Sequence, residues 1–199
     1  MSYEFIGVHP ISGAIGAEIG DVDLTTLNDQ TFQEILRAFH EHLVIFFRDQ
    51  TLSPEQQISF AHRFGKIGFY PFVEGMKAHP EIVEVRKEPE EKENFGGVWH
   101  SDTAYLATPP LGAALYAKEL PPDGGDTIWS NMYLAHDTLS DGMKRLLAGL
   151  KGVNSSNKGA PAVSRQARRD EAPRDPLDIQ HEAVHPVARI HPETGRKAL

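Results

Sequence analysis

Apolar side chains recur every three or four residues after Asn28, which is the spacing of one face of a helix. The positions on this face are Phe32, Ile35, Leu36, Phe39 and Leu43. Asn28 suits the N-cap position, because its side-chain oxygen can accept a hydrogen bond from the first helical turn. The pattern predicts one amphipathic helix, followed over residues 43–47 by an apolar run typical of a buried strand.

A second helix is delimited by residues that favour helix ends. Ser53 can cap its first turn, Pro54 suits the first helical position, and Gln56 completes a capping box. Gly65 follows the helical stretch, where glycine commonly ends a helix. Two shorter helices are expected over residues 133–139 and 141–150.

Short apolar runs bounded by turn residues predict strands in the rest of the chain. The expected strands are two within residues 3–24, then residues 82–85, 111–120, 126–130 and 183–190, with another opening at 197–199. The sequence PPDGG at 121–125 predicts a tight turn that would join 111–120 and 126–130 into a hairpin. Residues 156–180 are polar and without periodicity, which predicts a long surface loop or lid.

Composition narrows the class of protein. The 199 residues fit one domain over 1–199, and 40% hydrophobic and 24% charged residues are typical of a folded globular chain. A net charge of −8 argues against nucleic acid as a partner. No apolar stretch is long enough for a membrane span or a secretory signal, so a cytoplasmic protein with no membrane partner is expected. Without cysteine, any metal must be bound by His, Asp or Glu.

His100 and Asp102 are the candidate metal ligands. Residues two apart on an extended segment point to the same side, so an imidazole and a carboxylate there can share one ion. Such a pair supplies two positions of the facial triad that binds non-haem Fe(II). The pair alone is weak support, since a chain with 10 histidines often contains one by chance, and two solvated loop residues are the favoured interpretation of such an isolated pair.

The surrounding sequence is more specific. Residues 99–133 read WHSDTAYLATPPLGAALYAKELPPDGGDTIWSNMY, with a Pro-Pro pair, a Leu-Pro-Pro turn and a Gly-Gly-Asp-Thr segment after the His-x-Asp pair. This stretch resembles the taurine dioxygenase-like (TauD/TfdA) family of Fe(II)- and 2-oxoglutarate-dependent dioxygenases. The resemblance continues through residues 44–68 and 185–199.

The resemblance implies roles for three residues. His100 and Asp102 would be the first two iron ligands, and Thr127 would donate a hydrogen bond to a carboxylate of 2-oxoglutarate. It also implies an α+β fold, with a double-stranded β-helix (jelly-roll) core and flanking helices. The implied reaction hydroxylates a small organic acid (a sulfonate, a sulfate ester or an aryloxy acid), consuming O2 and converting 2-oxoglutarate to succinate and CO2.

The substrate itself is not implied to be taurine. Where taurine-binding members of the family carry a His and an Asn, this chain has Tyr70 and Gly96. Tyr70 and the nearby Asn94 are the substrate-contact candidates, although a loop Asn is more often a turn former. A homo-oligomer is compatible with the resemblance.

The family's distal iron-binding His and its 2-oxoglutarate-binding Arg follow the segment that matches residues 185–199, so the resemblance places both outside this chain. His181, His185 and His191 have a spacing that could substitute, but the last two match family positions with no ligand role. A buried carboxylate without its Arg partner loses about 3 to 5 kcal/mol. We therefore expect a fold incomplete at its C-terminal end and poor turnover by these 199 residues alone.

Two other functions fit part of the pattern. A cupin-like module would use the same fold to bind a ligand without redox chemistry, because fold does not fix function. A zinc hydrolase also uses His and carboxylate ligands, but the chain lacks the helical His-Glu-x-x-His pattern of many such enzymes.

Overall fold

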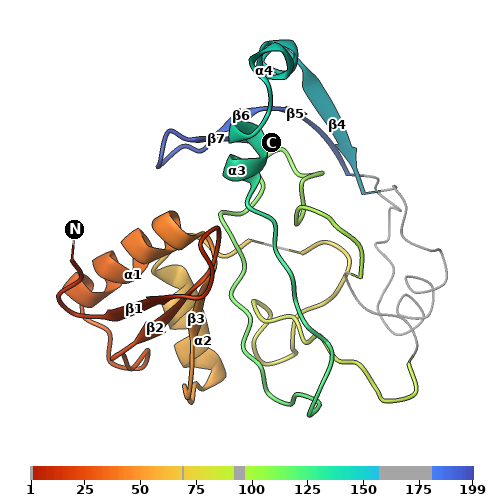
Figure 1. The fold of residues 1–199 in the computed structure, drawn as a ribbon. Helices are drawn as coiled ribbons and strands as arrows, with labels where there is room; N and C mark the ends of the chain where they lie inside the picture. The colour runs from red at the N-terminus through yellow and green to blue at the C-terminus, as the bar shows by residue number, and fades with distance from the viewer. Residues whose placement is uncertain (1, 69, 92–96, 157–180) are drawn as a thin grey trace. The chain divides into compact units, whose positions relative to one another are not determined.

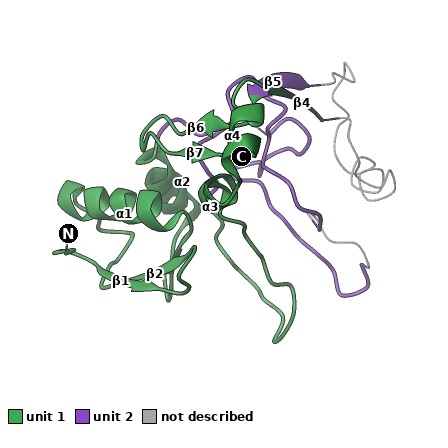
Figure 2. Ribbon diagram, turned by 45° about the horizontal axis from the view of Figure 1, so that its top comes forward, with its two compact units in different colours: residues 1–64, 114–151, 186–199 green, residues 65–113, 152–185 purple. Residues whose placement is uncertain are grey.

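The computed structural model describes residues 2–68, 70–91, 97–156 and 181–199. The chain divides into two compact units, each made of separate stretches of sequence (Figure 2). Unit 1 comprises Met1–Phe64, Ala114–Lys151 and Pro186–Leu199, and unit 2 comprises Gly65–Ala113 and Gly152–His185. Among the described helices, none is long and apolar enough to cross a membrane.

A small sheet and a helix form the start of unit 1 (Figure 1). Strand β1 (Gly7–Pro10) pairs antiparallel with β2 (Ala17–Gly20), and β2 pairs parallel with β3 (Ile45–Phe47). Helix α1 (Asp29–His42) packs against β2 and β3. Asn28 caps α1 by accepting a hydrogen bond from the backbone N–H of Thr31 at 2.9 Å. The predicted strands, helix and cap in this region are confirmed.

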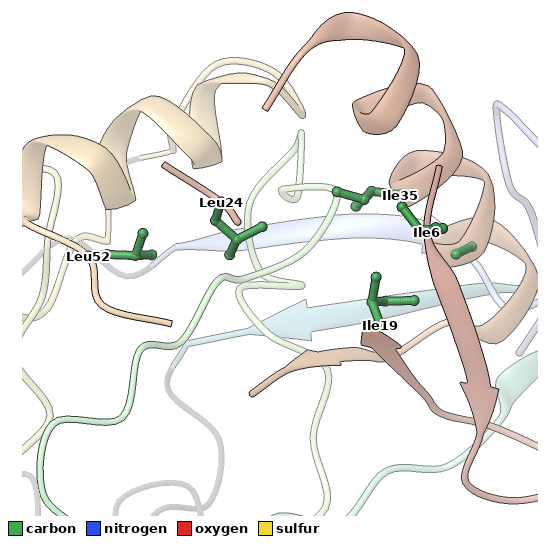
Figure 3. Packing of buried hydrophobic residues seen from close by; sticks show 6 residues of the cluster. Ile6, Ile19, Leu24, Ile35 and Leu52 are labelled. Atoms are coloured by element: carbon green, nitrogen blue, oxygen red, sulfur yellow. The ribbon is translucent and has the colours of Figure 1, made fainter. Parts of the chain in front are cut away.

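The core of unit 1 lies between α1 and this sheet (Figure 3). Its buried members are Ile6, Ile19, Leu24, Ile35, Ala38 and Leu52. The predicted apolar face of α1 supplies Ile35, which is fully buried. Tyr116 reaches the edge of this core, where its hydroxyl accepts from the backbone N–H of Leu52 and donates to the carbonyl of Gln50. Unit 1 is therefore stabilised mainly by burial of aliphatic side chains.

Helix α2 (Pro54–His62) begins as the sequence predicts. The Ser53 side chain accepts from the backbone N–H of Gln56, and the Gln56 side chain accepts from the backbone N–H of Ser53 at 2.8 Å, so the capping box is complete. Phe60 and Phe64 then meet edge to face, with ring centroids 5.3 Å apart. These rings join α2 to α1 through Phe32, whose ring lies 5.0 Å from that of Phe64.

The C-terminal half contains shorter elements. They are α3 (Met132–Asp137), α4 (Asp141–Leu147), β4 (Lys151–Ser155), β5 (Glu182–Pro186), β6 (Arg189–Ile190) and β7 (Lys197–Ala198). Strands β4 and β5 form one two-stranded sheet, and β6 and β7 form another. Both short helices are confirmed, and the strand predicted over 183–190 is present as β5 and β6. Strand β4 was not predicted, because its sequence KGVNS has little apolar character.

Three predicted strands are wrong. Residues 82–85, 111–120 and 126–130 have no strand pairing within the described part of the chain, so the predicted hairpin is absent. The chain bends at residues 122–123, and Gly124 and Gly125 have positive φ of 79° and 71°, but no hydrogen-bonded turn is present there. Leu115 is 84% exposed and Leu120 is 75% exposed, so their apolar character is not satisfied by burial. A strand exists only with a hydrogen-bonded neighbour, and an apolar run does not supply one.

The architecture over residues 2–68, 70–91, 97–156 and 181–199 is α+β, with one three-stranded and two two-stranded sheets. No double-stranded β-helix is assembled among these described sheets, and the jelly-roll stays a prediction. The predicted lid, 156–180, lies outside the described residues except for Ser156.

His191 gives unit 1 a predicted dependence on pH. Its Nδ1 accepts from the backbone N–H groups of Glu193 and Thr194, each at 3.3 Å, in the turn between β6 and β7. Burial, and secondly the charge of His40, lower the pKa of His191 below its usual value. The folded state therefore binds a proton at His191 less readily than the unfolded state, in which a histidine has a pKa of about 6.5.

We expect the free energy of unfolding to be highest above pH of about 6.5 and to fall as pH drops toward the lowered pKa. Urea unfolding followed by circular dichroism between pH 7.5 and 5 measures this slope. The variant His191→Gln should flatten it, whereas His9→Gln, at an exposed position of β1, should not. An unchanged slope in His191→Gln would assign the pH dependence to other groups.

Candidate metal centre

His100 and Asp102 lie in unit 2, on a segment without regular secondary structure. Their side chains point toward each other, with His100 Nε2 3.0 Å from Asp102 Oδ1. The other ring nitrogen, Nδ1, lies 2.6 Å from the backbone carbonyl oxygen of Val98. Both side chains are open to solvent, being 48% and 66% exposed, so an ion or a small molecule can reach them.

Both ring nitrogens of His100 face oxygen atoms that accept hydrogen bonds. The Val98 carbonyl lies at Nδ1 and the Asp102 carboxylate lies at Nε2, whereas a neutral imidazole has one N–H to donate. The tautomer that donates to Val98 leaves the Nε2 lone pair beside the Asp102 carboxylate, and a metal ion could share these two donor atoms.

The spacing of the two donor atoms suits a metal ion. Imidazole nitrogen and carboxylate oxygen bind divalent transition metals at about 2.0 to 2.2 Å, so two ligands at a right angle around one ion are about 3.0 Å apart. His100 Nε2 and Asp102 Oδ1 are 3.0 Å apart. Metal-binding histidines also commonly donate their other N–H to a backbone carbonyl, which fixes the ring, as Val98 does here.

A third protein ligand is not part of this arrangement. Among the described residues, no group of three His, Asp or Glu side chains is placed to hold a metal ion. His185 instead donates from Nε2 to the carbonyl of Leu106 at 3.0 Å. His191 belongs to the other unit and accepts hydrogen bonds in its own turn. Within the described ranges, none of His181, His185 and His191 therefore adds a third ligand to His100 and Asp102.

Thr127, the predicted 2-oxoglutarate contact, lies in unit 1 at an exposed position outside any helix or strand, two residues after Gly125. Its role is not tested by the geometry of either unit and stays a prediction. Asn94, one of the two substrate candidates, lies outside the described residues.

Tyr70, the other substrate candidate, belongs to an aromatic cluster in unit 2. Its ring centroid lies 5.9 Å from that of Phe72, and the Phe72 ring lies 5.5 Å from that of Tyr105 and 5.8 Å from that of His181. Tyr105 was not among the predicted site residues, although its position three residues after Asp102 indicated proximity to the candidate ligands. No local pattern indicated that Phe72 and His181 would join it.

Comparison with known proteins identifies the class of protein that this fold and site define. Residues 7–199 match the model of the family described as "Taurine catabolism dioxygenase TauD, TfdA family". The chain belongs to this family, whose characterised relatives include α-ketoglutarate-dependent dioxygenases; α-ketoglutarate is another name for 2-oxoglutarate. The predicted family is confirmed.

Individual relatives give the extent of the match. A (S)-phenoxypropionate/alpha-ketoglutarate-dioxygenase of Sphingobium herbicidovorans is 29% identical, with 96% of this chain and 69% of the relative covered. An alpha-ketoglutarate-dependent sulfate ester dioxygenase of Pseudomonas putida is 30% identical, and the match covers 98% of this chain and 65% of the relative. The crystal structure of a taurine dioxygenase from Burkholderia xenovorans is 30% identical and has a TM-score of 0.75. That match covers 98% of this chain and 63% of the crystallised chain. The chain thus spans about two thirds of the length of these relatives.

Proposed function

We propose that this chain provides the first two iron ligands and the 2-oxoglutarate contact of an Fe(II)- and 2-oxoglutarate-dependent dioxygenase. The observation that carries the proposal is the 3.0 Å approach of His100 Nε2 to Asp102 Oδ1, with Nδ1 of the same ring donating to Val98. Fe(II) would supply the redox chemistry that couples decarboxylation of 2-oxoglutarate by O2 to hydroxylation of the substrate.

The protein's own contribution is orientation and charge. The Val98 carbonyl holds the proton of His100 on Nδ1, which leaves Nε2 as the ligand atom. The Asp102 carboxylate offsets one of the two positive charges of the ion. The third protein ligand and the Arg for 2-oxoglutarate are expected from residues that follow the 185–199 segment in the family. With two ligands, this chain should bind Fe(II) weakly and turn over poorly.

The primary substrate is proposed to be a small organic acid. The two relatives named above act on a phenoxypropionate and on a sulfate ester, and a 28% identical relative from Saccharomyces cerevisiae is an alpha-ketoglutarate-dependent sulfonate dioxygenase. These substrates share an anionic group on a carbon skeleton. No contact in the described residues favours the alternative of a cupin-like module without redox chemistry.

The jelly-roll core is also proposed. Two solved structures that are 31% and 30% identical to this chain, with TM-scores of 0.73 and 0.75, are described as a putative alpha-ketoglutarate-dependent taurine dioxygenase and a taurine dioxygenase, both from Burkholderia xenovorans.

An anaerobic titration with Fe(II), followed by NMR, tests the proposal. Fe(II) is paramagnetic, so it should broaden the resonances of residues 98–102 first and leave exposed His9 unaffected. Added 2-oxoglutarate should strengthen the broadening, and air should then yield succinate in proportion to the Fe(II) bound. Broadening that is spread evenly over exposed histidines, or that ignores 2-oxoglutarate, would contradict the proposal.

Thr127→Val provides a separate prediction for the cosubstrate. Valine has nearly the same shape but no hydroxyl, so the variant should lose one hydrogen bond to a charged carboxylate and bind 2-oxoglutarate roughly tenfold or more weakly. Isothermal titration of 2-oxoglutarate into the Fe(II)-loaded chain measures the change. Thr51→Val, at an exposed position outside any helix or strand, is the matched control. Equal affinity in both variants would remove Thr127 from the site.

A further inference from the structure

Among the described residues of unit 2, two buried side-chain atoms lack a hydrogen-bond partner. They are Thr103 Oγ1 and His181 Nε2. Buried polar atoms are nearly always paired, so an orphan requires an explanation such as a ligand or a trapped water. Thr103 is also strained, with φ of 47°, which is rare for a β-branched residue. It directly follows the candidate ligand Asp102.

The two residues that carry these atoms meet at one turn. The backbone N–H of Leu106 donates to the Thr103 carbonyl at 2.9 Å and closes a turn over residues 103–106. Tyr105 is in this turn, and its ring centroid lies 6.0 Å from that of His181. His185 donates to the carbonyl of Leu106. Because residues 181 and 185 are an even number apart on extended chain, they share one face, and that face meets the turn.

The backbone of His181 is held in place. Its N–H donates to the Ser156 side-chain oxygen at 3.1 Å, and its carbonyl accepts from the Ser156 N–H at 2.9 Å. The rings of Phe72, Tyr105 and His181 touch one another in all three pairs, with centroids 5.5 to 6.0 Å apart. The imidazole is thus fixed with carbon surface on two sides and one nitrogen unpaired.

We propose that His181 Nε2 and Thr103 Oγ1 bind the acidic group of the primary substrate, while Phe72 and Tyr105 contact its apolar body. This inference rests on the proposed function. Three residues of chain span at most about 11 Å, so Tyr105 is within the length of a small organic acid from Asp102. The site favours an acid with an aryl or alkyl body over a compact zwitterion such as taurine, because a larger apolar body buries more surface against the rings of Phe72 and Tyr105.

The test measures direct binding of three acids, (S)-2-phenoxypropionate, hexyl sulfate and taurine, to the 199-residue chain by isothermal titration with and without Fe(II). Wild-type protein should bind at least one of the first two more tightly than taurine. His181→Phe keeps the ring but removes the nitrogen, and Thr103→Val keeps the shape but removes the hydroxyl. Each should weaken binding of the preferred acid roughly tenfold or more, and His181→Gln should restore part of the loss.

The controls separate this inference from the proposed function. His9→Phe, which alters an exposed imidazole on β1, should leave acid binding unchanged, and Fe(II) broadening at residues 98–102 should persist in His181→Phe and Thr103→Val. If His181→Phe fails to fold, the affinity of the isosteric variant Thr103→Val for the acid tests the inference. Loss of acid binding in these variants supports the inference even if wild-type protein does not bind Fe(II). In that case only the proposed function is contradicted. Unchanged affinity in Thr103→Val and folded His181→Phe, or no binding of any of the three acids by wild-type protein, overturns the inference.

Discussion

Replacing His100 with alanine is expected to abolish measurable Fe(II) binding. The imidazole supplies one of two ligand atoms that approach within 3.0 Å, and the remaining carboxylate of Asp102 is 66% exposed. Loss of outer partners that only orient a ligand already lowers metal affinity by about 10- to 100-fold. Removing the ligand itself should therefore lower the affinity for Fe(II) by about a hundredfold or more. Anaerobic calorimetric titration with Fe(II) measures this change.

The matched variants separate ligation from general charge. Asp102→Asn keeps the size of the side chain but removes its negative charge, so it should weaken Fe(II) binding nearly as much as His100→Ala. His9→Ala removes an exposed imidazole from unit 1 and should have no effect. The circular dichroism spectrum of each variant should match the wild type, since the pair is solvent-exposed and outside helices and strands. Retained Fe(II) affinity in His100→Ala would refute the metal centre.

The helices could be predicted because their determinants are local. Asn28 caps α1 and Ser53 opens the capping box of α2, and each hydrogen bond joins residues three apart in the sequence. Such contacts form whatever the rest of the chain does. The burial of Ile35 also followed from helical spacing, because only one face of α1 can meet the sheet.

The strands were predicted less well because pairing is not local. Residues 111–120 have the composition of a strand, but apart from Tyr116 they are exposed, and none of them pairs with a strand among the described residues. Strand β4 has a polar sequence, yet it pairs with β5, which lies about 30 residues further along the chain. Composition indicates which segments can be extended, whereas only a neighbouring backbone decides which of them become strands.

The candidate site likewise combines local contacts, which could be predicted, with contacts between distant segments, which could not. The approach of His100 to Asp102 could be predicted from a separation of two residues, and the structure brings their side chains together. The anchoring of the ring by Val98 is equally local but depends on a backbone carbonyl, which no residue type encodes. The contacts of His181 with Phe72 and Tyr105 join three segments far apart in the sequence, so only the folded chain reveals them.

Truncating Ile35 to alanine should produce the largest loss of stability among single substitutions in unit 1. Ile35 is fully buried between α1 and the sheet, in contact with the cluster that contains Ile6 and Ile19 (Figure 3). Loss of its side chain removes apolar burial and leaves a cavity, which costs roughly 2 to 5 kcal/mol. The total free energy of unfolding of a domain is commonly only about 5 to 15 kcal/mol, so this loss brings the variant close to unfolding.

Urea unfolding at pH 7.5, above the range in which His191 titrates, measures this loss without a contribution from protonation. Leu146→Ala on α4 is the matched control, because this leucine is 61% exposed and its truncation should change stability by no more than about 0.5 kcal/mol. Ile35→Val, which removes a single methylene, should lie between the two, at about 0.5 to 1.5 kcal/mol. If Ile35→Ala and Leu146→Ala cost the same, the core of unit 1 is not packed around α1, and the burial that stabilises this unit lies elsewhere.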